Sequence, residues 1–338
     1  MLHALAGTQE PEDVALNTRL TQQLGIAHPI ISAPMAFAAG GRLAAAVSAA
    51  GGLGLIGGGY GDAGWLDAEL RAAGNAPIGC GFITWSLKKQ PQLLDLVLAR
   101  SPHAVFLSFG DPEPFAARIK SSGTKLICQV QTRRDAARAI ACGADIVVAQ
   151  GSEAGGHGER RATLTLVPEV ADLIAATSPE TLLCAAGGIA DGRGLAAALM
   201  LGADGVLVGS RLWASNEANV SPRMHAAALA ATGDDTIRSQ VMDLARKLDW
   251  PARYTARVLR NAYIERWHGR EAELAAVADE EAAKYRKAWA EGDPEGSNTF
   301  IGEAAGLIHT IEPAGIIIER MVGEAERRIA GAARDVIS

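Results

Sequence analysis

The sequence predicts an α/β protein, a TIM (β/α)8 barrel with a smaller helical insertion after the eighth strand. Three observations lead to this prediction. Short apolar runs recur at regular intervals, Ala- and Leu-rich stretches with helical periodicity lie between them, and the regular spacing ends after residue 213. The chain has 338 residues. This is enough for one such barrel, which takes about 250 residues, and for a second, smaller unit.

Eight apolar runs are the candidate strands. Each is apolar throughout, as expected for parallel strands that are covered on both faces. The first residues of successive runs are mostly 21 to 26 residues apart. The runs span residues 29–32, 53–56, 78–83, 104–108, 125–130, 146–150, 182–186 and 205–208. The helical stretches between them span residues 41–50, 64–73, 90–100, 112–121, 132–142, 168–176 and 192–201.

An open, doubly wound sheet is the alternative to a closed barrel. It is less favoured because the eight units form one unbroken series and no G-x-G-x-x-G motif follows the first strand. One interval is longer, with 36 residues between the sixth and seventh runs. The additional length falls in residues 151–166, which a barrel places at its C-terminal face, where active sites are built.

The chain divides into three predicted parts. Residues 17–215 and 296–338 form the barrel, which ends in an amphipathic helix near residues 313–331. Residues 216–295 are rich in Ala, Arg, Glu and Lys, and we expect a small helical subdomain that covers the mouth of the barrel. Its scattered aromatic residues are expected mainly to pack the insertion. Residues 1–16 are expected to be a loosely ordered N-terminal extension.

Composition excludes several classes of partner. A net charge of −6 and a pI near 5.7 give no basic surface for nucleic acid or anionic membranes. No apolar stretch is long enough for a membrane span, and no secretory signal is apparent. The cysteines show no metal-ligand spacing and are expected to be free thiols, most of them buried, in a cytoplasmic protein without a metal. They are Cys80, Cys128, Cys142 and Cys184.

A phosphate site is predicted after the seventh and eighth strands. The segments Ala186–Gly192 and Val208–Arg211 bring Gly187, Gly188, Gly209 and Ser210 to the C-terminal ends of these strands. Glycine lets backbone N–H groups approach an anion closely, and barrels commonly bind phosphate at this position. The alternative is that these glycines only form tight turns.

A glycine-rich loop that ends in a histidine follows the sixth strand. It runs from Gln150 to Gly158 and contains Ala154, Gly155, Gly156 and His157. Small residues there would let the imidazole approach a flat ligand, and histidine gains or loses a proton near neutral pH. A surface or packing role is the alternative, which we keep for the other six histidines.

Further candidates lie at the ends of other strands. The turn Ala33-Pro34-Met35 could lay backbone and a polarizable side chain against a ring. Gln129, at the end of the fifth strand, is a candidate hydrogen-bond partner for that ring. Trp85 follows the third strand and is a weaker candidate for the substrate pocket.

The ordered set A-P-M at 33–35, E-A-G-G-H-G at 153–158, A-G-G-I-A-D-G at 186–192 and L-V-G-S-R at 207–211 resembles the nitronate monooxygenase family, formerly 2-nitropropane dioxygenases. The resemblance extends from about residue 18 to 325. It implies noncovalent FMN, with its phosphate at the two glycine turns and its ring near Pro34, Met35 and Gln129. It also implies that His157 is catalytic and that alkyl nitronates, and some nitroalkanes, are oxidised by O2 to a carbonyl compound and nitrite.

The sequence departs from the family pattern at two positions. Many members have Asn near the end of the third strand, where this chain has Gly81, and many have Lys in place of Gln129. These differences concern the reaction more than the cofactor, because lost side-chain contacts would alter the flavin potential or the choice of substrate.

Other functions stay open. The same glycine-histidine loop occurs in flavin-dependent enoyl-ACP reductases, and related members are NADH:quinone reductases, so an NAD(P)H-dependent flavin reductase is the first alternative. Another FMN barrel oxidoreductase, or a non-catalytic flavin-binding protein, is also compatible with the pattern. The sequence names neither the physiological substrate nor the oligomeric state, for which a homodimer is one option.

Overall fold

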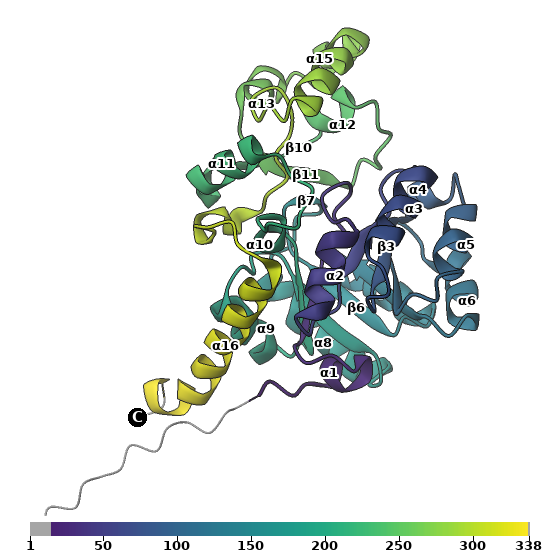
Figure 1. Cartoon of the computed structure of the whole chain (residues 1–338), viewed down its shortest axis with the longest axis vertical. Coiled ribbons are helices and arrows are strands. Elements are labelled where there is room, and N and C mark those ends of the chain that lie inside the picture. Colours follow the sequence, from purple (N-terminus) through teal and green to yellow (C-terminus); the bar gives the residue numbers. More distant parts are fainter. Residues whose placement is uncertain (1–14, 337–338) are drawn as a thin grey trace, which may run out of the picture.

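A closed barrel of eight parallel strands forms the centre of the computed structural model, which describes residues 15–336 (Figure 1). The strands pair in the order β1-β9-β8-β6-β5-β4-β3-β2. A parallel bridge between Ile31 and Leu53 joins the first strand to the segment before the second. The strands are β1 (Ile30–Ser32), β2 (Leu55–Gly57), β3 (Gly79–Ile83), β4 (Ala104–Ser108), β5 (Lys125–Val130), β6 (Ile146–Gln150), β8 (Leu182–Ala186) and β9 (Gly205–Val208). The predicted barrel is confirmed.

Successive strand residues divide the apolar core into two layers. Ile31 and Phe106 belong to the cluster inside the barrel, whereas their neighbours Ile30 and Val105 belong to the cluster between strands and helices. Both layers are buried, and each large side chain so removed from water contributes roughly 1.5–3 kcal/mol. The alternation explains why each run is apolar at every position. The four cysteines are free, and only Cys142 is partly exposed.

Helices follow the strands as predicted, and every predicted helical stretch overlaps a helix. The N-termini of two of them are fixed by side chains: Thr132 accepts from the Asp135 N–H, and Asp191 accepts from the N–H groups of Arg193 and Gly194. Such caps contribute about 1 kcal/mol each. The helices are α1 (Arg19–Leu24), α2 (Gly41–Ala49), α3 (Ala63–Ala72), α4 (Thr84–Leu87), α5 (Gln92–Leu98), α6 (Glu113–Ser121), α7 (Arg133–Ala141), α8 (Thr163–Thr177), α9 (Gly192–Met200) and α10 (Ser210–Trp213).

Residues 216–295, here called the cap, lie together at one end of the molecule (Figure 1). They contain α11 (Pro222–Ala230), η1 (Gly233–Asp235), β10 (Thr236–Ser239), α12 (Val241–Ala245), β11 (Thr255–Leu259), α13 (Ala262–Trp267), α14 (Glu271–Ala276) and α15 (Ala278–Ala290). The cap is therefore not only helical. Its two strands contain polar residues and an arginine each, so they lack the apolar runs that marked the barrel strands and do not stand out against the helix-forming composition around them.

The cap strands form a sheet with a strand from the barrel loop. Strand β11 pairs antiparallel with β10 and with β7 (Gly156–Gly158). This sheet joins the cap to the glycine-rich loop. The division of the chain into a barrel (17–215 and 296–338) and a separate unit (216–295) stays a prediction, and most of the predicted extension, residues 1–14, lies outside the described residues.

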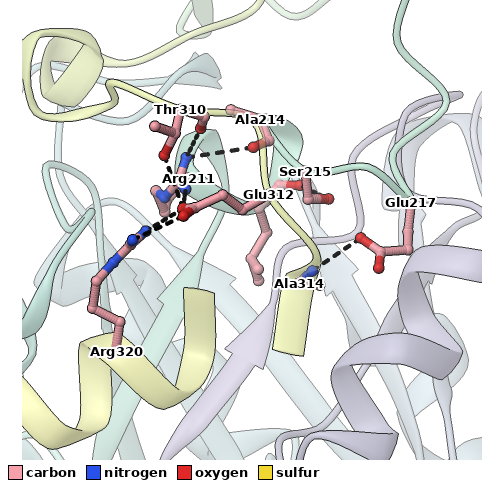
Figure 2. A network of polar contacts seen from close by, with 9 residues as sticks. Arg211, Ala214, Ser215, Glu217, Thr310, Glu312, Ala314 and Arg320 are labelled. Atoms are coloured by element: carbon pink, nitrogen blue, oxygen red, sulfur yellow. Dashed lines mark hydrogen bonds and ion pairs between the residues drawn. The ribbon is translucent and has the colours of Figure 1, made fainter. Parts of the chain in front are cut away.

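The chain returns to the barrel through η2 (Glu303–Leu307) and the long helix α16 (Ala314–Val336), which packs against α9 and α2. Figure 2 shows how this return is held. The buried guanidinium of Arg211 donates to the Thr310 carbonyl at 2.8 Å and to Glu312 Oε2 at 2.9 Å, and Arg320 donates to Glu312 Oε1 at 3.1 Å. The network ties α10 to the start of α16.

No helix among the described residues has the length and apolar character needed to cross a membrane.

Candidate active site

A cavity of about 750 Å³ lies at the C-terminal ends of the barrel strands, between the barrel and the cap. The predicted catalytic residue and all the predicted cofactor-binding residues line it. They are Ala33, Pro34, Met35, Gln129, Ala154, Gly155, Gly156, His157, Gly187, Gly188, Gly209 and Ser210. Eight-stranded barrels place their active sites at this face, and the volume is typical of a cofactor or ligand site.

Two glycine turns form one end of the cavity. Gly187 and Gly188 have φ angles of 102° and 76°, a region that other residues rarely adopt. Beside Gly209, an added Cβ would meet only the Ala33 Cβ, at 3.6 Å. The Ser210 Oγ accepts from the Gly302 N–H at 2.9 Å, which fixes the second turn against the returning segment. This end therefore exposes backbone to the cavity.

Contacts from three directions hold the glycine-rich loop between β6 and β7. The Glu153 carboxylate accepts from both the N–H and the hydroxyl of Thr163, at 2.9 Å from each donor. The Ser152 carbonyl accepts from Arg238 and Arg257 of the cap strands, at 3.1 Å and 2.9 Å. On the third side, the loop backbone lies too close to the returning segment for a side chain at Gly155, where a Cβ would lie 2.6 Å from backbone.

His157 lies on β7 and forms a buried pair with an aspartate of the cap. Its Nε2 is 3.0 Å and 2.9 Å from the two carboxylate oxygens of Asp243 on α12. The indole of Trp250 stacks on the imidazole, with ring centroids 3.4 Å apart and planes at 5°. The backbone pairing of β7 with β11 and these two side chains determine where the imidazole lies.

The protonation of His157 follows from these contacts. Burial lowers the pKa of His157, and the hydrogen bond and charge of Asp243 oppose that effect without cancelling it. The imidazole is thus neutral near pH 7. Asp243 accepts a hydrogen bond from Nε2–H, which leaves the lone pair on Nδ1. Such a ring can accept a proton, and the carboxylate then stabilises the imidazolium that forms.

Aromatic residues form the wall around the imidazole. Phe109 and Phe300 lie with ring centroids 6.1 Å from His157. Trp250 lines the cavity, although core packing was expected for the aromatic residues of the insertion, and Tyr285 and Trp289 line it as well. Trp85 is not brought into the wall and lies behind it, with its ring centroid 5.3 Å from that of Trp250.

The amide of Gln129 does not act alone. The Oε1 of Gln150, at the end of β6, accepts from Gln129 Nε2 at 3.0 Å and from Gln131 Nε2 at 2.8 Å. Gln150 also lines the cavity and was not predicted as a site residue. The pairing fixes the side chain of Gln129 at the cavity wall.

No group of three or more His, Cys, Asp or Glu side chains suited to a metal ion occurs in the part of the chain that the structure describes.

The comparisons with known proteins agree with this geometry. The family model for nitronate monooxygenase matches residues 17–86 and 83–324. The chain belongs to the nitronate monooxygenase family. Among curated relatives, the nitronate monooxygenase of Neurospora crassa is 35% identical, over 89% of each chain. The chain is accordingly an oxidoreductase.

Two solved structures resemble the whole chain. FabK from Thermotoga maritima is 34% identical, with a TM-score of 0.82 over 93% of this chain and 97% of that one. Nitroalkane oxidase from Streptomyces ansochromogenes is 26% identical, with a TM-score of 0.76 over 91% and 99%. Both similarities extend over the barrel and most of the cap.

Nitronate monooxygenases are flavoproteins, and the cavity fits a flavin. Open space adjoins the glycine backbone at both ends of the wall, since a Cβ at Gly156 would have no neighbour within 4 Å and one at Gly209 only Ala33. Apolar strand residues such as Phe106 and Leu207 form the floor. An apolar floor with exposed backbone donors suits a flat aromatic ring that carries a polar tail.

Gly81, one of the two expected departures from the nitronate monooxygenase pattern, lies against the Ala-Pro-Met turn. A Cβ at Gly81 would lie 2.4 Å from the Pro34 ring, so this chain places its Ala-Pro-Met turn where a larger residue would stand. Glycine at 81 and the position of Pro34 are therefore coupled. The structure gives no corresponding reason for Gln129 in place of Lys.

Proposed function

We propose that this protein uses FMN to oxidise alkyl nitronates, and some neutral nitroalkanes, with O2, giving a carbonyl compound and nitrite. The observation that carries the proposal is the buried His157–Asp243 pair at the wall of the cavity, in a member of the nitronate monooxygenase family. In this proposal His157 is the catalytic base and contacts the substrate. The small-molecule substrate and O2 are the only partners required.

The cavity supports FMN as the flavin. We assign the phosphate to Gly187, Gly188, Gly209 and Ser210, where two turns expose backbone N–H groups, and the ring to the walls formed by Pro34, Met35 and Gln129. When bound, FMN would supply the redox chemistry by taking an electron pair from the substrate and passing it to O2. The protein then has to bind, orient and deprotonate the substrate.

His157 suits the deprotonation of a neutral nitroalkane. Its lowered pKa keeps the imidazole neutral, and Nδ1 is the nitrogen not engaged by Asp243. The α proton would pass to Nδ1, while the C–H electron pair forms the C=N bond of the nitronate. A nitronate lacks this proton, so it needs the residue only for contact and orientation.

The proposal is tested by mixing FMN-loaded protein anaerobically with propyl-1-nitronate, and separately with NADH, while following the flavin absorbance. Bleaching by the nitronate alone, with nitrite released on admitting air, is the expected result. Bleaching by NADH alone would overturn the proposal.

The second candidate is an NAD(P)H-dependent flavin reductase of the enoyl-ACP reductase or NADH:quinone reductase type. The length of the cavity supports this second candidate. The lining extends from the strand ends to Trp289 on the cap, which leaves room for a ligand larger than a small nitronate. The NADH arm of the same experiment separates the two functions.

A further inference from the structure

The charges of the cavity wall are of one sign. Among the described residues that line it are two arginines, Arg246 and Arg286, and no aspartate, glutamate or lysine. The chain as a whole has a net charge of −6. A cavity with cationic side chains and low-dielectric walls concentrates anions relative to the rest of such a surface.

Arg246 is the cation that lies among the aromatic residues. It follows α12, three residues after Asp243, and its Nη1 is buried without a hydrogen-bond partner in the described part of the chain. Its Cζ lies 4.9 Å from the ring centroid of Tyr60 and 5.8 Å from that of Phe300. The rings stabilise the charge in part.

Asp243 acts on this guanidinium at a distance, without an ion pair. Within residues 15–332, no ion pair involves Arg246, and the nearest acid on its own helix, Asp243, has both oxygens within 3.0 Å of His157 Nε2. A guanidinium taken from water without a full set of hydrogen bonds is costly. Arg246 therefore lines the cavity with hydrogen-bonding capacity that the described residues do not use.

Other residues of the cavity lining also carry unpaired polar atoms. Trp250 Nε1, Tyr285 Oη and the side-chain amide of Asn298 are buried and have no hydrogen-bond partner among the described residues, and all three residues line the cavity. Unpaired buried polar atoms are uncommon, so several on one wall indicate a polar ligand.

Arg246 lies on the imidazole side of the cavity. Phe300 is a neighbour both of Arg246 and of His157, whose ring centroid is 6.1 Å from that of Phe300. The other flanking ring, Tyr60, follows β2, whereas the turns assigned to the cofactor phosphate follow β8 and β9. Arg246 is thus positioned to meet the substrate beside His157.

We propose that Arg246 binds the two oxygens of the nitronate group and supplies a positive charge beside them. This assignment rests on the proposed function and adds a substrate-contacting residue to it. The nitronate group is planar and shares one negative charge between two oxygens, which matches the fork of a guanidinium as a carboxylate does. Trp250, Tyr285 and Asn298 provide further donors around it.

The same contact assists deprotonation of a neutral nitroalkane. The α proton moves to His157 Nδ1, the C–H electron pair becomes the C=N bond, and the negative charge develops on the nitro oxygens. Arg246 then binds the charge where it forms, which stabilises the transition state more than the neutral substrate.

The test compares Arg246→Met with Arg246→Lys and with Arg266→Met, a control that removes the same charge from an exposed position of the cap outside the cavity lining. For Arg246→Met, kcat/KM with propyl-1-nitronate should fall about 10- to 100-fold, the loss expected for a charged hydrogen bond. Arg246→Lys should retain part of the activity, and Arg266→Met should change it less than threefold. FMN content and circular dichroism report folding, and the lysine variant carries the test if the methionine variant does not fold.

A binding measurement separates this inference from the proposed function. Sodium nitrite, a small anion with the same pair of oxygens, is titrated into FMN-loaded protein while flavin absorbance is followed. The apparent Kd should rise about tenfold or more in Arg246→Met and by less in Arg246→Lys. If wild-type flavin is not reduced by the nitronate, the proposed function fails, yet this titration still tests the anion site.

Three results would overturn the assignment. They are an unchanged nitrite Kd in Arg246→Met, an equal loss in Arg266→Met, and a loss confined to the nitronate of 3-nitropropionate with propyl-1-nitronate unaffected. The last result would mean that Arg246 binds a remote carboxylate in place of the reacting group.

Discussion

On the barrel side of the cavity, the site residues are neighbours in sequence. Gly187 and Gly188 directly follow β8, and Gly209 and Ser210 directly follow β9. On the cap side, His157 comes from a barrel loop, and the partners that orient its ring, Asp243 and Trp250, come from a segment about 90 residues later. The barrel side presents backbone, whereas the cap side presents charged and aromatic side chains. We infer that the barrel side binds the cofactor and that the cap side determines the chemistry.

Replacing the imidazole of His157 should cause the largest loss of activity among the cap-side changes. In His157→Asn, kcat/KM for 1-nitropropane should fall about 10²- to 10⁴-fold because the base is lost. Flavin content should be unchanged, since the glycine turns are intact. Steady-state oxygen consumption and the absorbance of the purified protein provide the two readouts. His103→Asn, at an exposed histidine, is the control, and unchanged nitroalkane turnover in His157→Asn would refute the role of the base.

Removing the charge of Asp243 tests the cap side more finely, because it changes the partner of His157 and leaves the imidazole in place. In Asp243→Asn, turnover of 1-nitropropane should fall roughly 10- to 100-fold, as for other partners that orient a reacting residue. Asp243 raises the pKa of His157 against the effect of burial, so the variant should have a still lower pKa. The acidic limb of the kcat/KM profile should therefore move to lower pH. Asp249→Asn, at an exposed position of the cap, is the matched control. A pH profile that does not move in Asp243→Asn would show that Asp243 does not affect the pKa of His157.

Strain introduced at a glycine turn tests the barrel side. Gly188→Ala places a side chain at φ 76°, which costs about 1–2 kcal/mol, and FMN affinity should fall about tenfold. Gly123→Ala is a matched control, because Gly123 has φ 78° and no neighbour within 4 Å of an added Cβ, after helix α6. Both variants should lose similar stability in urea unfolding. Equal FMN affinity in the two would argue against a phosphate site at this turn.

A change in the network around Glu312 should lower stability and should have the smallest effect on activity of the changes considered. Glu312→Gln leaves the buried Arg211 without its carboxylate and should lower the free energy of unfolding by about 2–3 kcal/mol at pH 7. Hydrogen bonding to Arg320 lowers the pKa of Glu312 to about 2, below its value in the unfolded chain. The difference between wild type and variant should therefore be complete above about pH 4.5 and shrink as pH falls towards 2.

Urea unfolding at pH 7 and at pH 3 measures this difference. Glu291→Gln removes an exposed ion pair with Lys287 and should change the free energy by less than about 0.5 kcal/mol. A constant difference between pH 7 and pH 3 for Glu312→Gln would show that charge is not its cause.

The sequence was sufficient to predict the barrel because its signals are local. Each strand is a short apolar run, and the turn after β8 carries its glycines within three residues of the strand end. The position of His157 in the cavity wall followed from the same reasoning. Its partner Asp243 did not, because an acid in a polar, helix-forming segment looks the same whether it faces solvent or a histidine. Arg246 was missed for the same reason. Strands β10 and β11 were missed because each carries polar residues and an arginine, Arg238 or Arg257, and so does not read as an apolar run.

The sharing of β7 between loop and cap has a consequence for how the enzyme could open. His157 pairs through its backbone with Ala256 of β11, and its ring is held by Asp243 and Trp250. An outward movement of this sheet that widened the mouth would carry the imidazole away from the barrel with it. Entry of substrate by that route and proton transfer would then be mutually exclusive in time, so that the enzyme is catalytically idle whenever it is open.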